Sequence, residues 1–339
     1  MTTIIAEAGV NHNGSLEIAK RLIDHAVDAG ADIIKFQTFK ADKLCSSHLP
    51  LAEYQSNNIT GINSQLEMLR RLELSEEMHI ELLEYCTSKH IEFLSTPFGV
   101  DSVEFLTKLP VKRWKIPSGE IDNVQLLKAV ANTNKPIILS TGMANLDDIE
   151  FAINTINKFS PGVTKISLLH CTTEYPAPFS EINLRSIPFM SERFNLPIGY
   201  SDHTEGIEAS IAACALGAKI IEKHFTLDKM MEGPDHKASI EPVELKKLVD
   251  SIRNITISLG DSKKGVANIE RKNMSIVKKF IVALRDIGKD EKFNEENIGL
   301  RRTGGGIPAK YFYDVVGTNA GKAYSSGQII DSSRFQSNK

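Results

Sequence analysis

The stretch from Ile198 to His236, IGYSDHTEGIEASIAACALGAKIIEKHFTLDKMMEGPDH, decides the fold. One apolar run delivers the residues SDH at 201–203, and a second apolar run, 218–221, delivers EKH at 222–224. Between them lies an amphipathic helical pattern, 206–216. This order predicts a strand, a crossover helix and a parallel strand, which brings the two polar triplets to the same edge of a sheet.

The same alternation of apolar runs and helical patterns continues through residues 1–259, which we expect to form one catalytic domain. Gly30 and Gly217 follow expected helices, where a left-handed residue commonly ends a helix. Eight repeats favour a (β/α)8 TIM barrel, with an open doubly wound sheet as the alternative. The eight expected strands are Ile4–Ala8, Ile33–Thr38, Glu92–Thr96, Arg113–Ile116, Ile137–Ser140, Ile166–His170, Ile198–Ser201 and Lys219–His224.

Three segments depart from this alternation. Residues 40–65 are polar and weakly periodic, and a loop of this length is usually functional, so we expect it to cover the mouth of the barrel. Residues 260–275 contain glycine and charged residues and are expected to form a linker. Residues 276–339 contain the strand-like pieces FIVAL, KYFYDVVG and GQII, which predict a small β-rich domain.

Composition restricts the class of protein. With 41% hydrophobic and 24% charged residues, the chain has the balance of a water-soluble globular protein. It has no signal-peptide pattern and no apolar run of about 18 residues, so we expect a cytoplasmic protein without membrane contact. A net charge of -3 without a basic tail argues against nucleic-acid binding.

The four cysteines lie far apart and form no CxxC pair, so they are expected to be free thiols. Cys171 follows an expected strand. It is either a nucleophile or, the interpretation we favour, a small apolar residue that fills space.

Two histidines lie just beyond neighbouring strands. His203 and His224 each follow an apolar run, and Asp235 places a further carboxylate on the same rim. Either histidine alone would fit a structural role, but the pairing favours a metal site, because neutral imidazole binds several divalent metals.

The other expected strand ends are also polar. Lys35 and Lys115 offer positive charge, while Ser118 and Ser140 offer hydroxyl donors, a combination that suits a phosphate or a carboxylate. Glu7 and Glu120 are then placed for acid-base chemistry. The alternative is that these two glutamates form structural ion pairs with the two lysines.

A series of motifs along nearly the whole chain resembles the N-acetylneuraminate (sialic acid) synthase family. In order they are IIAEAGVNHNGS, IKFQTF, STPF, WKIPSGE, ILSTGM, LHCTTEYP, GYSDHT, EKHFT, GPDH and RRTGGG. The resemblance implies a TIM barrel followed by a small antifreeze-like (SAF) domain, and a domain-swapped homodimer. It also implies the condensation of phosphoenolpyruvate with N-acetylmannosamine and water to give N-acetylneuraminic acid and phosphate.

The resemblance assigns roles to individual residues. Glu7 and Glu120 would be catalytic, and His203 and His224 would hold a divalent metal, Mn²⁺ first with Mg²⁺ and Co²⁺ as alternatives. Arg302 would reach the sugar from the small domain of the partner chain. The substrate-binding residues would be Lys35, Gln37, Thr96, Lys115, Ser118, Ser140, Thr173, Tyr175, Ser201, Asp235 and Arg302.

The sequence departs from the family pattern near the expected sugar. Thr173 stands where some members have asparagine, Ile276 where some have an aromatic residue, and Thr303 where proline is expected. These differences leave other acceptors open. Relatives use a 2,4-diacetamido-2,4,6-trideoxyhexose to make N,N'-diacetyllegionaminic or pseudaminic acid, or use phosphorylated N-acetylmannosamine. A barrel that binds an anionic sugar without catalysis is the alternative from another class.

Overall fold

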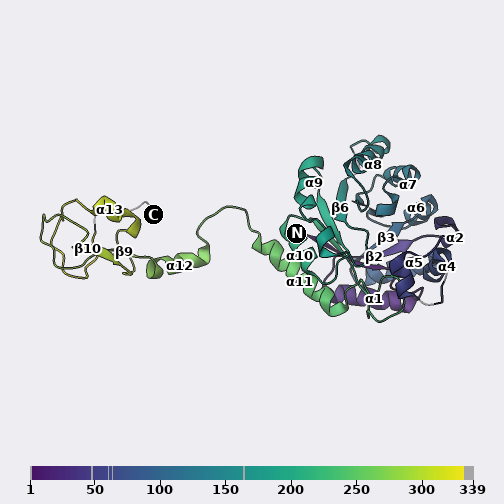
Figure 1. Ribbon diagram of the computed structural model, residues 1–339, viewed down its shortest axis with the longest axis horizontal. Coiled ribbons are helices and arrows are strands. Elements are labelled where there is room, and N and C mark those ends of the chain that lie inside the picture. The colour runs from purple at the N-terminus through teal and green to yellow at the C-terminus, as the bar shows by residue number, and fades with distance from the viewer. Residues whose placement is uncertain (1, 47–48, 60, 63, 163–164, 332–339) are drawn as a thin grey trace. The chain divides into compact units, whose positions relative to one another are not determined.

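The computed structural model describes residues 2–46, 49–59, 61–62, 64–162 and 165–331 (Figure 1). Residues 1–260 and 261–339 form two compact units. Residues 47–48, 60 and 63 of the expected cover, and 332–339 of the expected small domain, lie outside the described part.

The first unit is a nearly closed barrel of eight parallel strands. Its strands pair in the order β3-β2-β1-β8-β7-β6-β5-β4, and β3 lies beside β4 to complete the ring. This confirms the predicted TIM barrel. The strands are β1 (Thr3–Gly9), β2 (Ile33–Thr38), β3 (Glu92–Pro97), β4 (Trp114–Ile116), β5 (Ile137–Ser140), β6 (Ile166–Cys171), β7 (Ile198–Asp202) and β8 (Ile220–His224).

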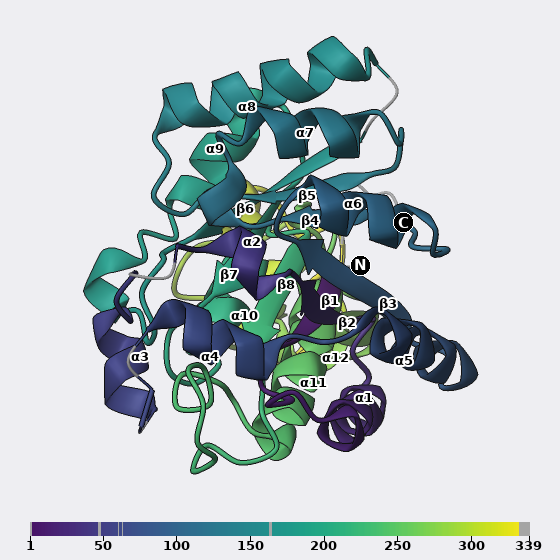
Figure 2. The same ribbon diagram turned by 90° about the vertical axis from the view of Figure 1, so that its right-hand side faces the viewer.

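Helices surround the strands, as Figure 2 shows. They are α1 (Leu16–Ala29), α5 (Glu76–Ser88), α6 (Val100–Thr107), α7 (Val124–Ala131), α8 (Leu146–Phe159), α9 (Ser186–Phe194), α10 (Glu208–Ala215) and α11 (Pro242–Ser258). Helix α1 shows why they form. The Ser15 side chain accepts a hydrogen bond from the Ile18 N–H at its start, and Gly30 ends it with φ 83°. Among the described helices, none combines the length and apolar character that a membrane crossing needs.

Alternation along the strands separates two interior layers. Ile5, Ile33, Leu94, Ile138, Leu169 and Ile220 form an apolar plug inside the barrel. Side chains of a strand alternate between its two faces, so the next inward positions lie one layer further along. Those positions carry Glu7, Lys35 and Glu222, all buried. The plug therefore forms the floor beneath a polar layer.

The segment expected to be a loop over the barrel mouth, residues 40–65, contains two short helices, α2 (Ala41–Leu44) and α3 (Glu53–Asn58), and α4 (Gln65–Leu72) begins at its last residue. Figure 2 shows α2 in front of the strands, with α4 and then α3 to its lower left. Val10, Phe39, Ile59, Met68 and Leu72 form a small apolar cluster beneath them. The prediction of an irregular loop was wrong because α2 and α3 are too short to show a periodic pattern.

The second unit contains α12 (Asn268–Val277), an antiparallel pair β9 (Phe280–Ala283) and β10 (Ile298–Arg301), a 3-10 turn η3 (Ala309–Tyr311) and α13 (Phe312–Val315). The predicted linker includes most of α12. One expectation fails here, because KYFYDVVG is helical rather than extended. Its apolar residues Phe312 and Val315 are three positions apart and both pack on the small core, which a strand with period two would not allow.

Candidate active site

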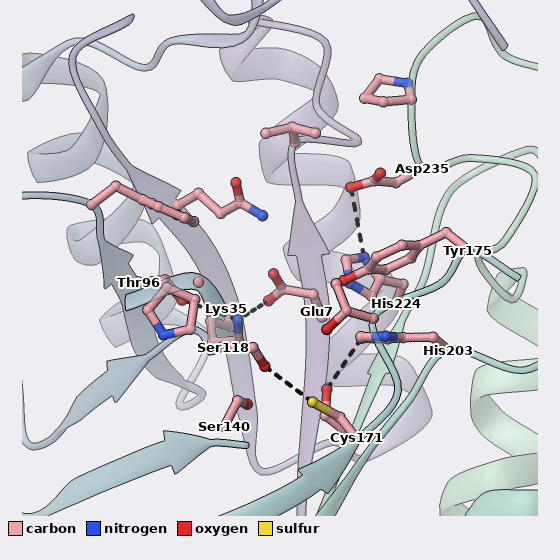
Figure 3. Close-up of a pocket in the computed structure, with 18 of the residues that line it drawn as sticks. Glu7, Lys35, Thr96, Ser118, Ser140, Cys171, Tyr175, His203, His224 and Asp235 are labelled. Carbon is pink, nitrogen blue, oxygen red and sulfur yellow. Dashed lines mark hydrogen bonds and ion pairs between the residues drawn. The ribbon is translucent and has the colours of Figure 1, made fainter. Parts of the chain in front are cut away.

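A cavity of about 480 Å³ opens at the C-terminal ends of the barrel strands (Figure 3). Most of the residues predicted from strand ends meet there, which is where barrel enzymes place their active sites. The predicted residues that line it are Glu7, Lys35, Gln37, Thr96, Lys115, Ser118, Ser140, Thr173, Tyr175, Ser201, His203, His224 and Asp235.

Two lysines and two carboxylates form the centre of the cavity. Lys35 Nζ lies 2.9 Å from Glu7 Oε2 and 3.6 Å from Glu222 Oε2. Lys115 Nζ lies 3.7 Å from Glu222 Oε1. All four side chains are at most 4% exposed. The lysines also donate hydrogen bonds to hydroxyls, Lys35 to Thr96 Oγ1 at 3.0 Å and Lys115 to Ser140 Oγ at 2.7 Å.

The two carboxylates are in different electrostatic environments. Burial raises the pKa of Glu7 to about 7, against the attraction of Lys35. Burial also opposes the charge of Glu222, but Lys115 and Lys35 together hold the pKa of that carboxyl below its usual range. Glu7 therefore exchanges a proton near neutral pH, whereas Glu222 stays charged.

One oxygen of each carboxylate faces the same lysine. Glu7 Oε2 and Glu222 Oε2 are both buried and both lie within ion-pair range of Lys35 Nζ. One ammonium group therefore serves both carboxylates, and it lines the cavity together with them.

The two histidines meet beside this cluster. His203 Nδ1 donates to the Thr172 carbonyl at 2.7 Å, which leaves the Nε2 lone pair unprotonated. The buried His224 Nδ1 has no hydrogen-bond partner among the described residues and lies 3.9 Å from Asp235 Oδ2. Tyr175 stacks on His203 at 4.2 Å between ring centroids.

These histidines fit a metal in charge and position. Burial lowers the pKa of His203 to about 4 and that of His224 well below its usual value, so both imidazoles are neutral, as metal ligands must be. Their ring centroids lie 5.5 Å apart. Among the described residues there is no group of three or more histidine, cysteine or acidic side chains that could together hold a metal ion.

A glycine allows a close contact at the serine end of the cavity. The Gly142 N–H donates to Ser118 Oγ at 3.0 Å, and Ser118 Oγ lies 3.1 Å from Cys171 Sγ. A β-carbon at position 142 would lie 2.3 Å from Thr173 Oγ1, so only glycine fits without displacement. Burial raises the pKa of the Cys171 thiol, which supports the space-filling role over the nucleophile.

Glu120 is the predicted site residue of the first unit that does not line the cavity. Glu120 ends the 3-10 turn η1 (Ser118–Glu120), which follows β4 and directs its carboxylate to accept a hydrogen bond from Asn123 Nδ2 at 2.5 Å. Asn123 in turn caps α7. Arg302 is exposed in the second unit, just beyond β10.

Glu222 is the site residue that the sequence analysis missed. Its signal was available, because residues two apart on a strand point the same way and His224, two positions on, was predicted to reach the site as a metal ligand. Ser201 Oγ donates to Glu222 Oε1 at 2.9 Å and holds that carboxylate in place.

The outward neighbours of Ser201 and Glu222 hold the loop that carries His203. Asp202 pairs with Lys223 in the strand register, and Lys223 Nζ lies 3.1 Å from Asp202 Oδ2. Asp202 also accepts hydrogen bonds from the Thr204 N–H at 2.9 Å and from Ser210 Oγ at 2.6 Å. This buried network fixes the backbone on both sides of His203.

Comparison with known proteins finds similarity in sequence and in fold. Residues 22–264 match the model of the NeuB family. The N,N'-diacetyllegionaminic acid synthase of Campylobacter jejuni is 51% identical over 97% of this chain and 98% of its own, and that of Legionella pneumophila is 45% identical over 96% and 92%. The solved N-acetylneuraminic acid (sialic acid) synthetase of Leptospira borgpetersenii is 36% identical, with a TM-score of 0.72 over 80% of this chain and 90% of its own.

The electrostatics predict a carboxyl group that titrates near neutrality. In protein labelled with ¹³C at the glutamate carboxyl, one resonance should titrate with a pKa of about 7, Glu7 being protonated below that pH and charged above it. The resonance should vanish in Glu7→Gln. In the control Glu120→Gln, which lies outside the cavity, it should persist. A titration near pH 7 that survives Glu7→Gln would contradict the assignment.

Proposed function

Because the chain belongs to the NeuB family of phosphoenolpyruvate-dependent synthases, we propose that it condenses phosphoenolpyruvate with a 2,4-diacetamido-2,4,6-trideoxyhexose and water to give N,N'-diacetyllegionaminic acid and phosphate. The observation that carries the reaction is the buried cluster of Lys35, Lys115, Glu7 and Glu222 beside two neutral histidines. The acceptor is supported by the similarity to two N,N'-diacetyllegionaminic acid synthases, which favours it over the N-acetylmannosamine expected from the motifs.

Phosphoenolpyruvate fits the lysine end of the cavity. Lys35 and Lys115 supply two positive charges, and Thr96, Ser118 and Ser140 supply hydroxyls around them. Phosphate and carboxylate oxygens need this combination of charge and donors. The lysines would release Glu7 and Glu222 in part and pair with the ligand instead.

The reaction needs one proton delivered and one removed. As C3 of phosphoenolpyruvate bonds to the aldehyde carbon, the aldehyde oxygen takes up a proton and positive charge builds at C2. Water then adds to C2 and loses one proton. The resulting C2 hydroxyl passes its remaining proton to the departing phosphate as the C–O bond to phosphate breaks, which leaves a ketone. Glu7, with a pKa near the working pH, suits these transfers. Glu222, held charged, suits stabilisation of the positive charge.

His203 and His224 are the residues that we propose hold a divalent cation, Mn²⁺ in the first instance. The support is their neutral state, the oriented Nε2 of His203 and the unpaired Nδ1 of His224. Such an ion supplies Lewis-acid polarisation of the acceptor's carbonyl. Asp235 and Tyr175 border the same space and would orient the sugar.

The acceptor is tested by phosphate release. The purified protein should release phosphate from phosphoenolpyruvate only when an acceptor is present, and 2,4-diacetamido-2,4,6-trideoxymannose should give a kcat/KM at least roughly tenfold above that for N-acetylmannosamine, the scale of discrimination by one or two apolar groups. Equal or reversed preference would contradict the proposed acceptor. No release with any N-acetylated sugar would contradict the reaction.

The metal is tested by binding and by turnover. Exhaustive chelation should abolish activity, Mn²⁺ should restore it, and titration calorimetry should show one Mn²⁺ site in the wild type that is lost in His224→Ala. The control is His25→Ala, because His25 is a half-buried histidine on α1 outside the cavity. Full turnover by a metal-free preparation would exclude the proposal.

We also propose that Arg302 acts on the partner's site in a domain-swapped homodimer, on the strength of the family resemblance and of its exposed position in the second unit. Arg302→Ala and Lys115→Met should each be inactive. After subunit exchange, an equal mixture should regain about a quarter of the wild-type sites, because each mixed dimer then holds one intact site. A mixture that stays inactive would place the arginine in its own chain's site or outside catalysis.

A further inference from the structure

Helix α4 gives the cavity an apolar wall. Gln65, Met68, Leu69 and Leu72 all line the cavity, and their spacing puts them on one face of the helix. Val10 and Phe98 extend this apolar surface, and Gln55 adds a second carboxamide. The rest of the lining is mostly charged or hydroxyl-bearing, so this wall differs in chemistry from the strand ends.

The wall lies on the side of Asp235. Met68 and Leu72 also line a neighbouring hollow together with Gly233 and Pro234, the residues just before Asp235. Asn58 Nδ2, at the end of α3, donates a hydrogen bond to the Pro234 carbonyl at 2.9 Å and so links α3 to the same segment. Figure 3 shows Asp235 at the end of the cavity opposite Ser140, which pairs with Lys115.

This position selects the part of the acceptor that meets the wall. The aldehyde carbon must lie against phosphoenolpyruvate at the lysine end, so carbons 4 to 6 extend away from it, toward α4. In N-acetylmannosamine these carbons carry hydroxyls. Against leucine and methionine the hydroxyls would give up their hydrogen bonds to water and form no new ones, which is unfavourable. In the trideoxy sugar C4 carries an acetamido group and C6 is a methyl group, while C5 keeps its hydroxyl. The two methyl groups offer apolar contact, and the amide can pair with a carboxamide.

We infer that α4 is the element that selects the acceptor, with Leu69 and Met68 in contact with the methyl groups at the C4 and C6 end of the sugar and Gln65 beside the C4 acetamido group. This inference rests on the proposed function and names the residues that determine its specificity. In this arrangement the residues at the strand ends hold phosphoenolpyruvate and carry out the chemistry, and the side chains of α4 contact the acceptor sugar and determine which sugar binds.

Leu69 is the residue to change. Met68 and Leu72 are 3% and 6% exposed and belong to the small apolar cluster, so replacing either would disturb the packing of α4 itself. Leu69 is half-buried and packs only against the edge of that cluster. Leu44 packs against the same edge but does not line the cavity, which makes Leu44→Gln the matched control.

The experiment compares Leu69→Gln, Leu44→Gln and wild type with both sugars. Leu69→Gln should lower kcat/KM for the trideoxy sugar by about tenfold or more, the effect of lost methyl contacts. It should leave kcat/KM for N-acetylmannosamine unchanged or higher, and KM for phosphoenolpyruvate within about twofold of wild type, because the lysine end is untouched. Leu44→Gln should keep the wild-type ratio between the sugars. Leu69→Ala, which adds no polar group, should shift the ratio in the same direction if Leu69→Gln folds poorly.

The outcomes separate the two proposals. If wild type prefers the trideoxy sugar but neither Leu69 variant changes that preference, or if Leu44→Gln changes it equally, the role of α4 is overturned and the proposed function stands. If wild type prefers N-acetylmannosamine, the proposed function fails and this inference fails with it.

Discussion

The structure depends on the burial of two lysines and two carboxylates in one layer of the barrel. Separating any of these charges from its partners inside the protein would cost several kcal/mol, so the four groups must be matched. The match is uneven, because burial raises the pKa of Glu7 to about 7 against the attraction of Lys35, whereas Lys115 and Lys35 hold the pKa of Glu222 below its usual range against the effect of burial. An anionic ligand beside Lys35 would weaken the attraction that this lysine exerts on Glu7 and raise its pKa further. Binding of phosphoenolpyruvate would thereby favour the protonated form of the residue proposed to supply a proton.

Strand register keeps this arrangement in place. Ser201 and Glu222 are partners across β7 and β8, and so are Asp202 and Lys223 one position along. The first pair points into the cavity, and the second forms a buried ion pair on the helix side. A slip of one residue would exchange the two pairs and put a lysine where the carboxylate is needed. The outer pair therefore secures the inner one, and its hydrogen bonds to residues 204 and 210 also fix the loop that bears His203.

The sequence allowed the barrel and most of the cavity to be predicted, because both follow from short-range regularities. Apolar runs mark the strands, and in a barrel the residues after them must converge. What it could not show depended on local geometry. Glu120 follows β4 just as Ser118 does, yet one turn of 3-10 helix carries its carboxylate out to Asn123. Helix α4 went unassigned because it has only eight residues and begins where the polar stretch ends, at Gln65. The helical KYFYDVVG was misassigned because its aromatic and β-branched residues favour strands in isolation.

The cavity has two ends with different structural supports, and this difference explains how chemistry and specificity can be separate. The lysine end is built from strand residues whose positions are set by the register of all eight strands, so a change there shifts the reacting groups. The α4 wall rests on its own small cluster around Val10, Phe39 and Ile59, outside the main core. A substitution on the cavity face of α4 alters the surface that the sugar would contact. It leaves unchanged the pairing of β1 with β2, which positions Glu7 and Lys35. A family that keeps one reaction while differing in acceptor would be expected to vary at such an independently supported wall.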